Sequence, residues 1–147
     1  MKGMIDFEQI PKWWPLCGNS QCSRAQECMR HVAFTQAPQG VTRWLCLLPT
    51  AVKDGECRFF QRNESVKMAR GFSNIFDTIV SLDARHGIRM ELTRYFGSKG
   101  SYYRYRNGER WMNPAQQRFV ADVLQRHGVE AASLFDEYQE AHDYYAE

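Results

Sequence analysis

Hydrophobic positions in the second half of the chain recur at intervals of three and four residues. Between about Glu64 and His86, the series comprises Ala69, Phe72, Ile75, Phe76, Ile79 and Val80. This spacing places apolar side chains on one face of a helix, where they can be buried together. Gly87 follows directly, and glycine is a common residue just beyond a helix end. The pattern therefore predicts an amphipathic helix over about 64–86.

Further helices are predicted after Gly87. Ile88–Phe96 would form a helix that ends at Gly97, and Ser101–Asn107 is a short segment between two glycines. The clearest boundaries follow, because Asn113 is a favoured N-cap residue, Pro114 suits the first helical position and Gly128 suits the position after the end. The remaining segment, Glu130–Tyr145, is predicted to be a last helix.

The first sixty residues have a less regular pattern, with many Cys, Trp, Pro and Gly residues. Ser23–Phe34 is predicted to be a short helix with Ser23 as its N-cap. Val41–Leu48 is rich in strand-forming residues, and Glu56–Gln61 is its predicted hairpin partner across the turn "KDGE". The expected fold is mainly α (α+β). A cysteine-rich module with a short β-hairpin, residues 1–62, precedes a bundle of four to five helices, residues 63–147, with a helix-turn-helix-like segment at 88–128.

Composition indicates an ordinary globular protein. The chain has 147 residues, of which 44% are hydrophobic and 24% are charged. No apolar run approaches the roughly 18 residues of a membrane-spanning helix. The N-terminal sequence "MKGMIDFEQIPKWWP" lacks the apolar core of a secretory signal. We therefore expect a cytoplasmic protein with no membrane partner.

Three of the five cysteines, Cys17, Cys22 and Cys28, lie within twelve residues. Disulfides are rare in the cytosol, and an odd number of cysteines cannot pair completely within one chain. Zn²⁺ binds four thiolates in a closed tetrahedron. We expect a structural zinc site formed by these three residues and Cys57, because Gly55 lets the chain turn close to an ion.

Other interpretations of the cysteines remain open. Cys46 or His31 could provide the fourth zinc ligand instead of Cys57, although Cys46 lies in the apolar run "WLCLL", where a buried free thiol is common. The thiols could also be free, form a disulfide, or hold an iron–sulfur cluster. Four thiolates around zinc leave no open coordination position, so this metal would stabilise the module without catalysing a reaction.

Charge is distributed unevenly although the net charge is only +2. Residues 85–110 contain two acids, Glu91 and Glu109, against Arg85, Arg89, Arg94, Lys99, Arg104, Arg106 and Arg110. Residues 129–147 contain only acidic charges. A basic region of this kind indicates a polyanionic partner, and two solvated faces of opposite sign are the alternative explanation.

The basic region also contains a short helix, a glycine and a second short segment, which is the order of a helix-turn-helix. The sequence resembles Cro and phage-repressor domains at Leu92, at Phe96–Gly97, at "RYRNGER" (Arg104–Arg110) and at "FVADVLQRHGV" (Phe119–Val129). The resemblance implies that Lys99, Ser101, Tyr102 and Arg104 face DNA, with Arg106 and Arg110 nearer its backbone. The alternative is a surface segment with half-buried tyrosines and solvated arginines.

The whole chain resembles a family of small uncharacterised bacterial proteins. The shared features are a Cys-x4-Cys-x5-Cys-(Leu/Met)-Arg start, here Cys17 to Arg30, and a "YYRYR-x-G" segment, here Tyr102–Gly108. This resemblance implies that the two halves form one unit, and it implies no activity.

No catalytic group of residues and no nucleotide-binding motif is evident in the sequence. We therefore expect a protein that is not an enzyme and has no small-molecule substrate. The first functional hypothesis is a small zinc-stabilised protein that binds DNA or RNA. The alternative is an adaptor that binds a protein partner through Trp13 and Trp14, since paired tryptophans are typical of interfaces.

Overall fold

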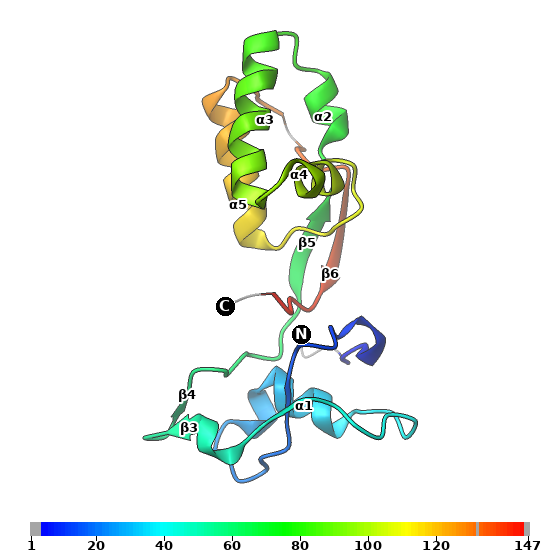
Figure 1. Ribbon diagram of the computed structural model, residues 1–147, viewed down its shortest axis with the longest axis vertical. Helices are drawn as coiled ribbons and strands as arrows, with labels where there is room; N and C mark the ends of the chain where they lie inside the picture. The colour runs from blue at the N-terminus through cyan, green and yellow to red at the C-terminus, as the bar shows by residue number, and fades with distance from the viewer. Residues whose placement is uncertain (1–3, 132, 146–147) are drawn as a thin grey trace. The chain divides into compact units, whose positions relative to one another are not determined.

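The computed structural model describes residues 4–131 and 133–145 and divides the chain into two units (Figure 1). The first unit comprises Met1–Ser65 together with His142–Glu147, and the second comprises Val66–Ala141. The boundary expected from the sequence lies between residues 62 and 63. The fold is mixed α+β, with five α-helices and three two-stranded sheets in the described residues. None of the helices described is long and apolar enough to cross a membrane.

Short elements build the first unit. They are η1 (Phe7–Gln9), β1 (Leu16–Cys17), η2 (Ala25–Glu27), α1 (Met29–Thr35), β2 (Cys46–Leu47), η3 (Pro49–Ala51), β3 (Val52–Lys53) and β4 (Glu56–Cys57). The buried residues of its core are Ile5, Ile10, Trp14, Leu16, Met29, Ala33 and Tyr144. Tyr144 packs edge-on against Trp14, with ring centroids 5.2 Å apart. The C-terminal residues of the chain therefore complete the core of the N-terminal unit.

The predicted turn in "KDGE" is confirmed. Asp54 and Gly55 both have positive φ, and β3 and β4 pair antiparallel on either side of them. The predicted pairing of residues 41–48 with 56–61 is wrong, because β2 pairs parallel with β1. The backbone N–H of Leu16 donates to the carbonyl oxygen of Leu45 over 2.9 Å. Strand β1, from near the start of the chain, therefore pairs with β2 in place of the predicted partner, residues 56–61.

The first predicted helix starts later than expected. Helix α1 begins at Met29, with Cys28 as its N-cap, and Ser23 does not cap it. Residues around Cys28 instead pair with a distant segment, since the N–H of Met29 donates to the Gln61 carbonyl oxygen over 2.6 Å. The N–H of Asn63 donates to the Glu27 carbonyl oxygen over 2.8 Å. These bonds hold the chain extended at Cys28 and prevent an earlier helical start.

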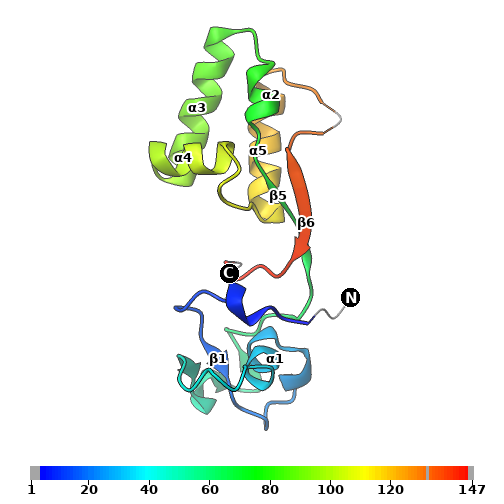
Figure 2. The ribbon, with the colours of Figure 1, turned by 90° about the vertical axis from the view of Figure 1, so that its right-hand side faces the viewer.

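The second unit packs four helices against one small sheet (Figures 1 and 2). Its elements are β5 (Val66–Arg70), α2 (Ser73–Asp77), α3 (Leu82–Phe96), α4 (Lys99–Arg106), α5 (Pro114–Arg126) and β6 (Glu137–Ala141). Helices α3 and α5 lie side by side, and α4 runs across the C-terminal end of α3. The core consists of Ala69, Phe72, Phe76, Ile79, Ile88, Leu92, Tyr102, Met112, Val120, Val123, Leu124 and Phe135.

The long helix predicted over 64–86 is wrong. The chain there forms strand β5, a turn at Gly71 and the short helix α2. Gly71 has φ +76°, which lies outside the helical region. Most of the apolar residues that suggested a helix are nevertheless buried, whereas Val80 is 93% exposed. The hydrophobic spacing thus identified core positions, but the backbone there does not form the single helix that the spacing predicted.

The predicted helix over 130–145 is also wrong. Its middle forms strand β6, which pairs antiparallel with β5 in the register Met68 opposite Gln139. The predicted start of α5 is confirmed, because Asn113 and Gln116 form a reciprocal capping box and Pro114 occupies the first helical position. The predicted helix end at Gly97 is confirmed too, since this residue caps α3 with φ 92°.

Candidate functional sites

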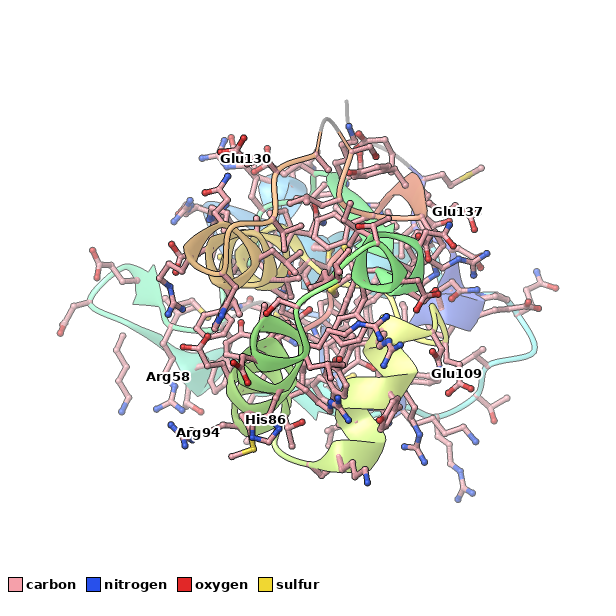
Figure 3. All side chains as sticks on the ribbon, turned by 90° about the horizontal axis from the view of Figure 1, so that it is seen from above. Arg58, His86, Arg94, Glu109, Glu130 and Glu137 are labelled. Atoms are coloured by element: carbon pink, nitrogen blue, oxygen red, sulfur yellow. The ribbon has the colours of Figure 1, made fainter. Side chains whose placement is uncertain are left out.

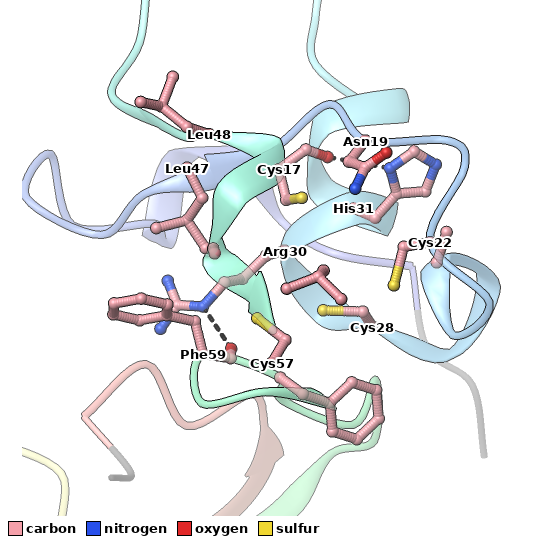
Figure 4. A pocket seen from close by; sticks show the side chains of 14 residues that line it. Cys17, Asn19, Cys22, Cys28, Arg30, His31, Leu47, Leu48, Cys57 and Phe59 are labelled. Carbon is pink, nitrogen blue, oxygen red and sulfur yellow. Dashed lines mark hydrogen bonds between the residues drawn. The ribbon is translucent and has the colours of Figure 1, made fainter. Parts of the chain in front are cut away.

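Four cysteines of the first unit line one cavity. Cys17, Cys22, Cys28 and Cys57 surround a space of about 30 Å³, and His31 also lines it. Figure 4 shows the thiols of Cys28 and Cys57 beside one another at this space. The structure thus brings together the four cysteines that the sequence selected as zinc ligands.

Each of these cysteines is held by a different local structure. Cys17 ends β1, Cys57 ends β4 and Cys28 precedes α1. Cys22 lies in the loop before η2, where its N–H donates to the Asn19 carbonyl oxygen over 3.4 Å. The cavity therefore depends on the tertiary structure of the whole unit.

The two alternative ligands differ in position. Cys46 is exposed and does not line the cavity, whereas its neighbour Leu47 does. His31 lines it, and its Nδ1 lies 2.9 Å from the carbonyl oxygen of Cys17. That contact leaves Nε2 as the ring nitrogen available for a ligand.

A partly buried guanidinium lies beside the thiols. Arg30 Nε donates to the Phe59 carbonyl oxygen over 2.9 Å, and its Nη1 donates to the Pro15 carbonyl oxygen over 2.8 Å. Burial lowers the pKa of Arg30, while the nearby thiols of Cys28, Cys57 and Cys17 oppose this shift. Arg30 therefore supplies positive charge to the cysteine cluster.

The donor set suits zinc, but the thiols are not arranged as a coordination sphere in the structure. All five cysteines are free, and no group of three His, Cys, Asp or Glu side chains within 4–131 and 133–145 is close enough to hold a metal. A tetrahedral site with Zn–S bonds of about 2.3 Å needs sulfur atoms roughly 3.8 Å apart. Zinc binding would therefore require the four thiol groups to move closer together.

The two tryptophans have different environments. Trp14 is 1% exposed and belongs to the core, so it is not available to a partner. Trp13 is 55% exposed and packs edge-on against Tyr145, with ring centroids 5.4 Å apart. Of the two tryptophans expected to bind a partner, only Trp13 is therefore exposed enough to do so.

The basic region forms a corner between two helices. Gly97 ends α3, and the Ser98 hydroxyl caps α4 by accepting from the Ser101 N–H over 3.1 Å. Arg94, on the last turn of α3, points outward (Figure 3). We call this corner, residues 94–110, the basic corner.

The six predicted nucleic-acid contacts are spread over exposed and buried positions of the basic corner. Lys99, Arg104 and Arg110 are exposed. Ser101 is half-buried and accepts a hydrogen bond from Arg110 Nη1 over 3.2 Å. The expectation that Tyr102 faces DNA is wrong, because its side chain is 0% exposed and packs in the helical core.

Arg106 is held against the protein surface. Its guanidinium lies over the Phe76 ring at 4.0 Å, and its Nη2 is 3.6 Å from Asp77 Oδ1. Arg85 Nη2 is 4.0 Å from the same oxygen. The sequence suggested Arg85 only as part of a basic run, and Arg106 also as a contact near the DNA backbone. The cluster could not be foreseen because Asp77 was expected inside one long helix over 64–86, whereas it ends the short helix α2.

Comparison with known proteins identifies a family but no described relative. No curated protein and no solved structure matches the chain. A family model, described as a family of unknown function (DUF6078), matches residues 1–144. The match extends over both units of the fold. The chain therefore belongs to the family of unknown function DUF6078.

Proposed function

We propose that this protein is a zinc-stabilised module joined to a nucleic-acid-binding helical unit. The zinc proposal is supported by one observation, the convergence of Cys17, Cys22, Cys28 and Cys57 on a single cavity. Cys46, which the sequence left as an alternative fourth ligand, is exposed and does not line it.

Two properties of the first unit suit a structural metal. Its strands are only two residues long, so few backbone hydrogen bonds hold the segments together. A zinc ion held by four thiolates has a net charge of −2, and Arg30 beside the cavity would offset part of it. Because metal binding and folding are coupled in such small modules, the ion would stabilise the native arrangement.

Elemental analysis of protein purified without chelator or added metal tests the zinc proposal. We expect about one zinc per chain. Cys28→Ser should lose the metal and destabilise the unit, whereas the matched control Cys46→Ser should retain it. Metal-free, folded protein whose thiols react readily would contradict the proposal, and bound iron would assign an iron–sulfur cluster instead.

The nucleic-acid proposal is supported by uncompensated positive charge at the basic corner. Among the described residues, Arg94, Lys99, Arg104 and Arg110 form no ion pair, although all four are exposed. Unpaired surface cations attract a polyanion and release its counterions on binding. Tyr102 makes no direct contribution, since its side chain is buried.

Anisotropy titrations of labelled single- and double-stranded oligonucleotides over a range of salt concentrations test this function. We expect affinity to fall steeply as salt rises. Arg104→Glu should weaken binding strongly, whereas the same charge reversal at Arg43, exposed in the first unit, should have a smaller effect. Binding that is absent, insensitive to salt or equally reduced by both variants would contradict the proposal.

A protein-binding adaptor is the second candidate, and exposed Trp13 supports it. Aromatic residues that combine exposure with rigid packing are frequent anchors of interfaces. Under this proposal, a protein partner remains bound after nuclease treatment and is lost with Trp13→Ala. Loss of the partner on nuclease treatment would favour nucleic acid.

A further inference from the structure

We infer that Arg85, Arg89 and Arg106 form a binding site for a single phosphate group. The identity of the ligand rests on the proposed nucleic-acid function. Under that function, the bound group is a phosphate of the nucleic-acid backbone. Arg85 and Arg89 belong to α3, and Arg106 ends α4. The site therefore lies where two helices of the second unit meet.

Charge in this cluster is not balanced. Asp77 is the acid that pairs with it, through contacts of 3.6 Å to Arg106 and 4.0 Å to Arg85. Both distances exceed the roughly 2.7–2.9 Å of a charge-assisted hydrogen bond. Arginine stays protonated at all ordinary pH values, so the three guanidiniums carry three positive charges, and the Asp77 carboxylate contacts two of them. An anion would relieve the excess positive charge.

Several donors of the cluster also lack partners. The Nε atoms of all three arginines are buried and have no hydrogen-bond partner among the described residues. The hydroxyl of Tyr102, a residue that is 0% exposed, lies beside these donors. Burial raises the pKa of Tyr102, whereas the charge of Arg106, a hydrogen bond with Arg106 and the charge of Arg89 oppose the shift, which indicates that this hydroxyl lies close to both arginines.

Buried donors without acceptors are costly, and native proteins rarely retain them. A phosphate offers several acceptor oxygens and matches the planar fork of a guanidinium. It would satisfy more of these donors than the single carboxylate of Asp77 does.

The cluster is accessible from one side. The side chain of Asp77 is 65% exposed, while those of Arg85 and Arg106 are 31% and 17% exposed. An anion that approaches beside Asp77 would meet the terminal nitrogens of Arg85 and Arg106 first. The Phe76 ring lies under both guanidiniums, at 5.3 and 4.0 Å, and limits their movement.

The test uses the full chain and inorganic phosphate, followed by NMR of the arginine Nε–Hε signals. We expect saturable shifts at Arg85, Arg89 and Arg106. Arg106→Gln should weaken phosphate binding roughly ten-fold, and Asp77→Asn should strengthen it because the competing carboxylate is removed. Arg118→Gln, at an exposed position of α5 outside both the cluster and the basic corner, should leave phosphate affinity unchanged.

The outcomes separate this inference from the proposed function. Oligonucleotide binding in the absence of saturable phosphate shifts at the three Nε signals would overturn the phosphate site and leave the nucleic-acid proposal standing. Phosphate binding at the cluster without oligonucleotide binding would support the site and contradict nucleic acid as its ligand. Arg106→Lys, which keeps the charge, controls for loss of folding. If Asp77→Asn weakens phosphate binding while the protein remains folded, the inference is wrong.

Discussion

The imidazole of His127 lies directly over the backbone of Gly87. A β-carbon added at Gly87 would come within 2.5 Å of His127 Cε1. The same imidazole is also held by Glu91, since His127 Nε2 lies 3.1 Å from Glu91 Oε2. The close approach of α3 and α5 therefore depends on a glycine in the middle of a helix.

We predict that Gly87→Ala destabilises the second unit. The added methyl group must displace the imidazole from Glu91, at a cost of about 1–3 kcal/mol. Alanine favours the helix by roughly 1 kcal/mol, which offsets part of this cost. Gly100→Ala is the matched control, because it lies in α4 with only Ser98 Oγ nearby, at 4.0 Å. Denaturant unfolding should rank Gly100→Ala above Gly87→Ala in stability, and the reverse order would contradict the contact.

Glu91 should make stability depend on acid pH. Hydrogen bonds from Arg126 and then His127 lower the pKa of its carboxyl group below the ordinary value of 4.5. Folding therefore favours the ionised form. The stabilisation is present above pH 4.5 and is lost as pH falls through the lower pKa of the folded state.

Denaturant unfolding of the wild type and Glu91→Gln over a range of pH measures this effect. The variant should be less stable near pH 7, and the difference should shrink at pH values below 4.5. Asp122→Asn, which removes the other carboxylate bound to Arg126, is the control. A difference that stays constant with pH would show that the Glu91 carboxylate is not stabilised by folding.

His142 should also make stability fall as pH decreases, over a higher pH range than Glu91 does. Burial lowers the pKa of its imidazole below 6.5, and Nε2 lies 2.9 Å from Asn63 Oδ1. Folding therefore favours the neutral ring, so the unfolded chain takes up a proton first as pH falls. Stability is full above pH 6.5 and decreases as pH drops from there towards the lower folded pKa.

The measurement is unfolding of the wild type and His142→Gln between pH 5 and 8. The variant should lose the part of the pH dependence that lies just below pH 6.5. His86→Gln, at an exposed position of α3, is the control and should follow the wild type. Equal pH profiles for wild type and His142→Gln would contradict the prediction.

The capping box at the start of α5 should contribute measurably to stability. The Asn113 side chain accepts from the Gln116 N–H over 2.9 Å, and the Gln116 side chain accepts from the Asn113 N–H over 3.0 Å. Asn113→Ala should destabilise the unit by about 1 kcal/mol, whereas Asn113→Asp should preserve most of the stability. Thermal unfolding of the two variants checks this, and equal losses would contradict a capping role.

The sequence by itself determined several local features. Asn113 and Pro114 fix the start of α5, Gly97 fixes the end of α3, and Asp54 with Gly55 fixes a hairpin turn. These signals act within a few residues, through side-chain caps and backbone conformations that depend on the residue type alone. The apolar spacing also identified most of the core around Phe72 and Phe76.

Only the tertiary structure decided whether core segments became helix or strand. Val66–Arg70 and Glu137–Ala141 are strands because each satisfies the backbone hydrogen bonds of the other, although they lie far apart in the sequence. For the same reason, the hydrogen bonds of Met29 with Gln61 and of Asn63 with Glu27 set the start of α1.

The candidate sites likewise depend partly on the sequence and partly on the tertiary structure. Sequence spacing selected the four cysteines, and residue type selected the basic corner. Folding placed the cysteines around one cavity, buried Tyr102 in the core and brought Asp77 beside Arg85 and Arg106. Residue type determines which chemistry a side chain offers, whereas long-range packing and hydrogen bonding determine which side chains meet.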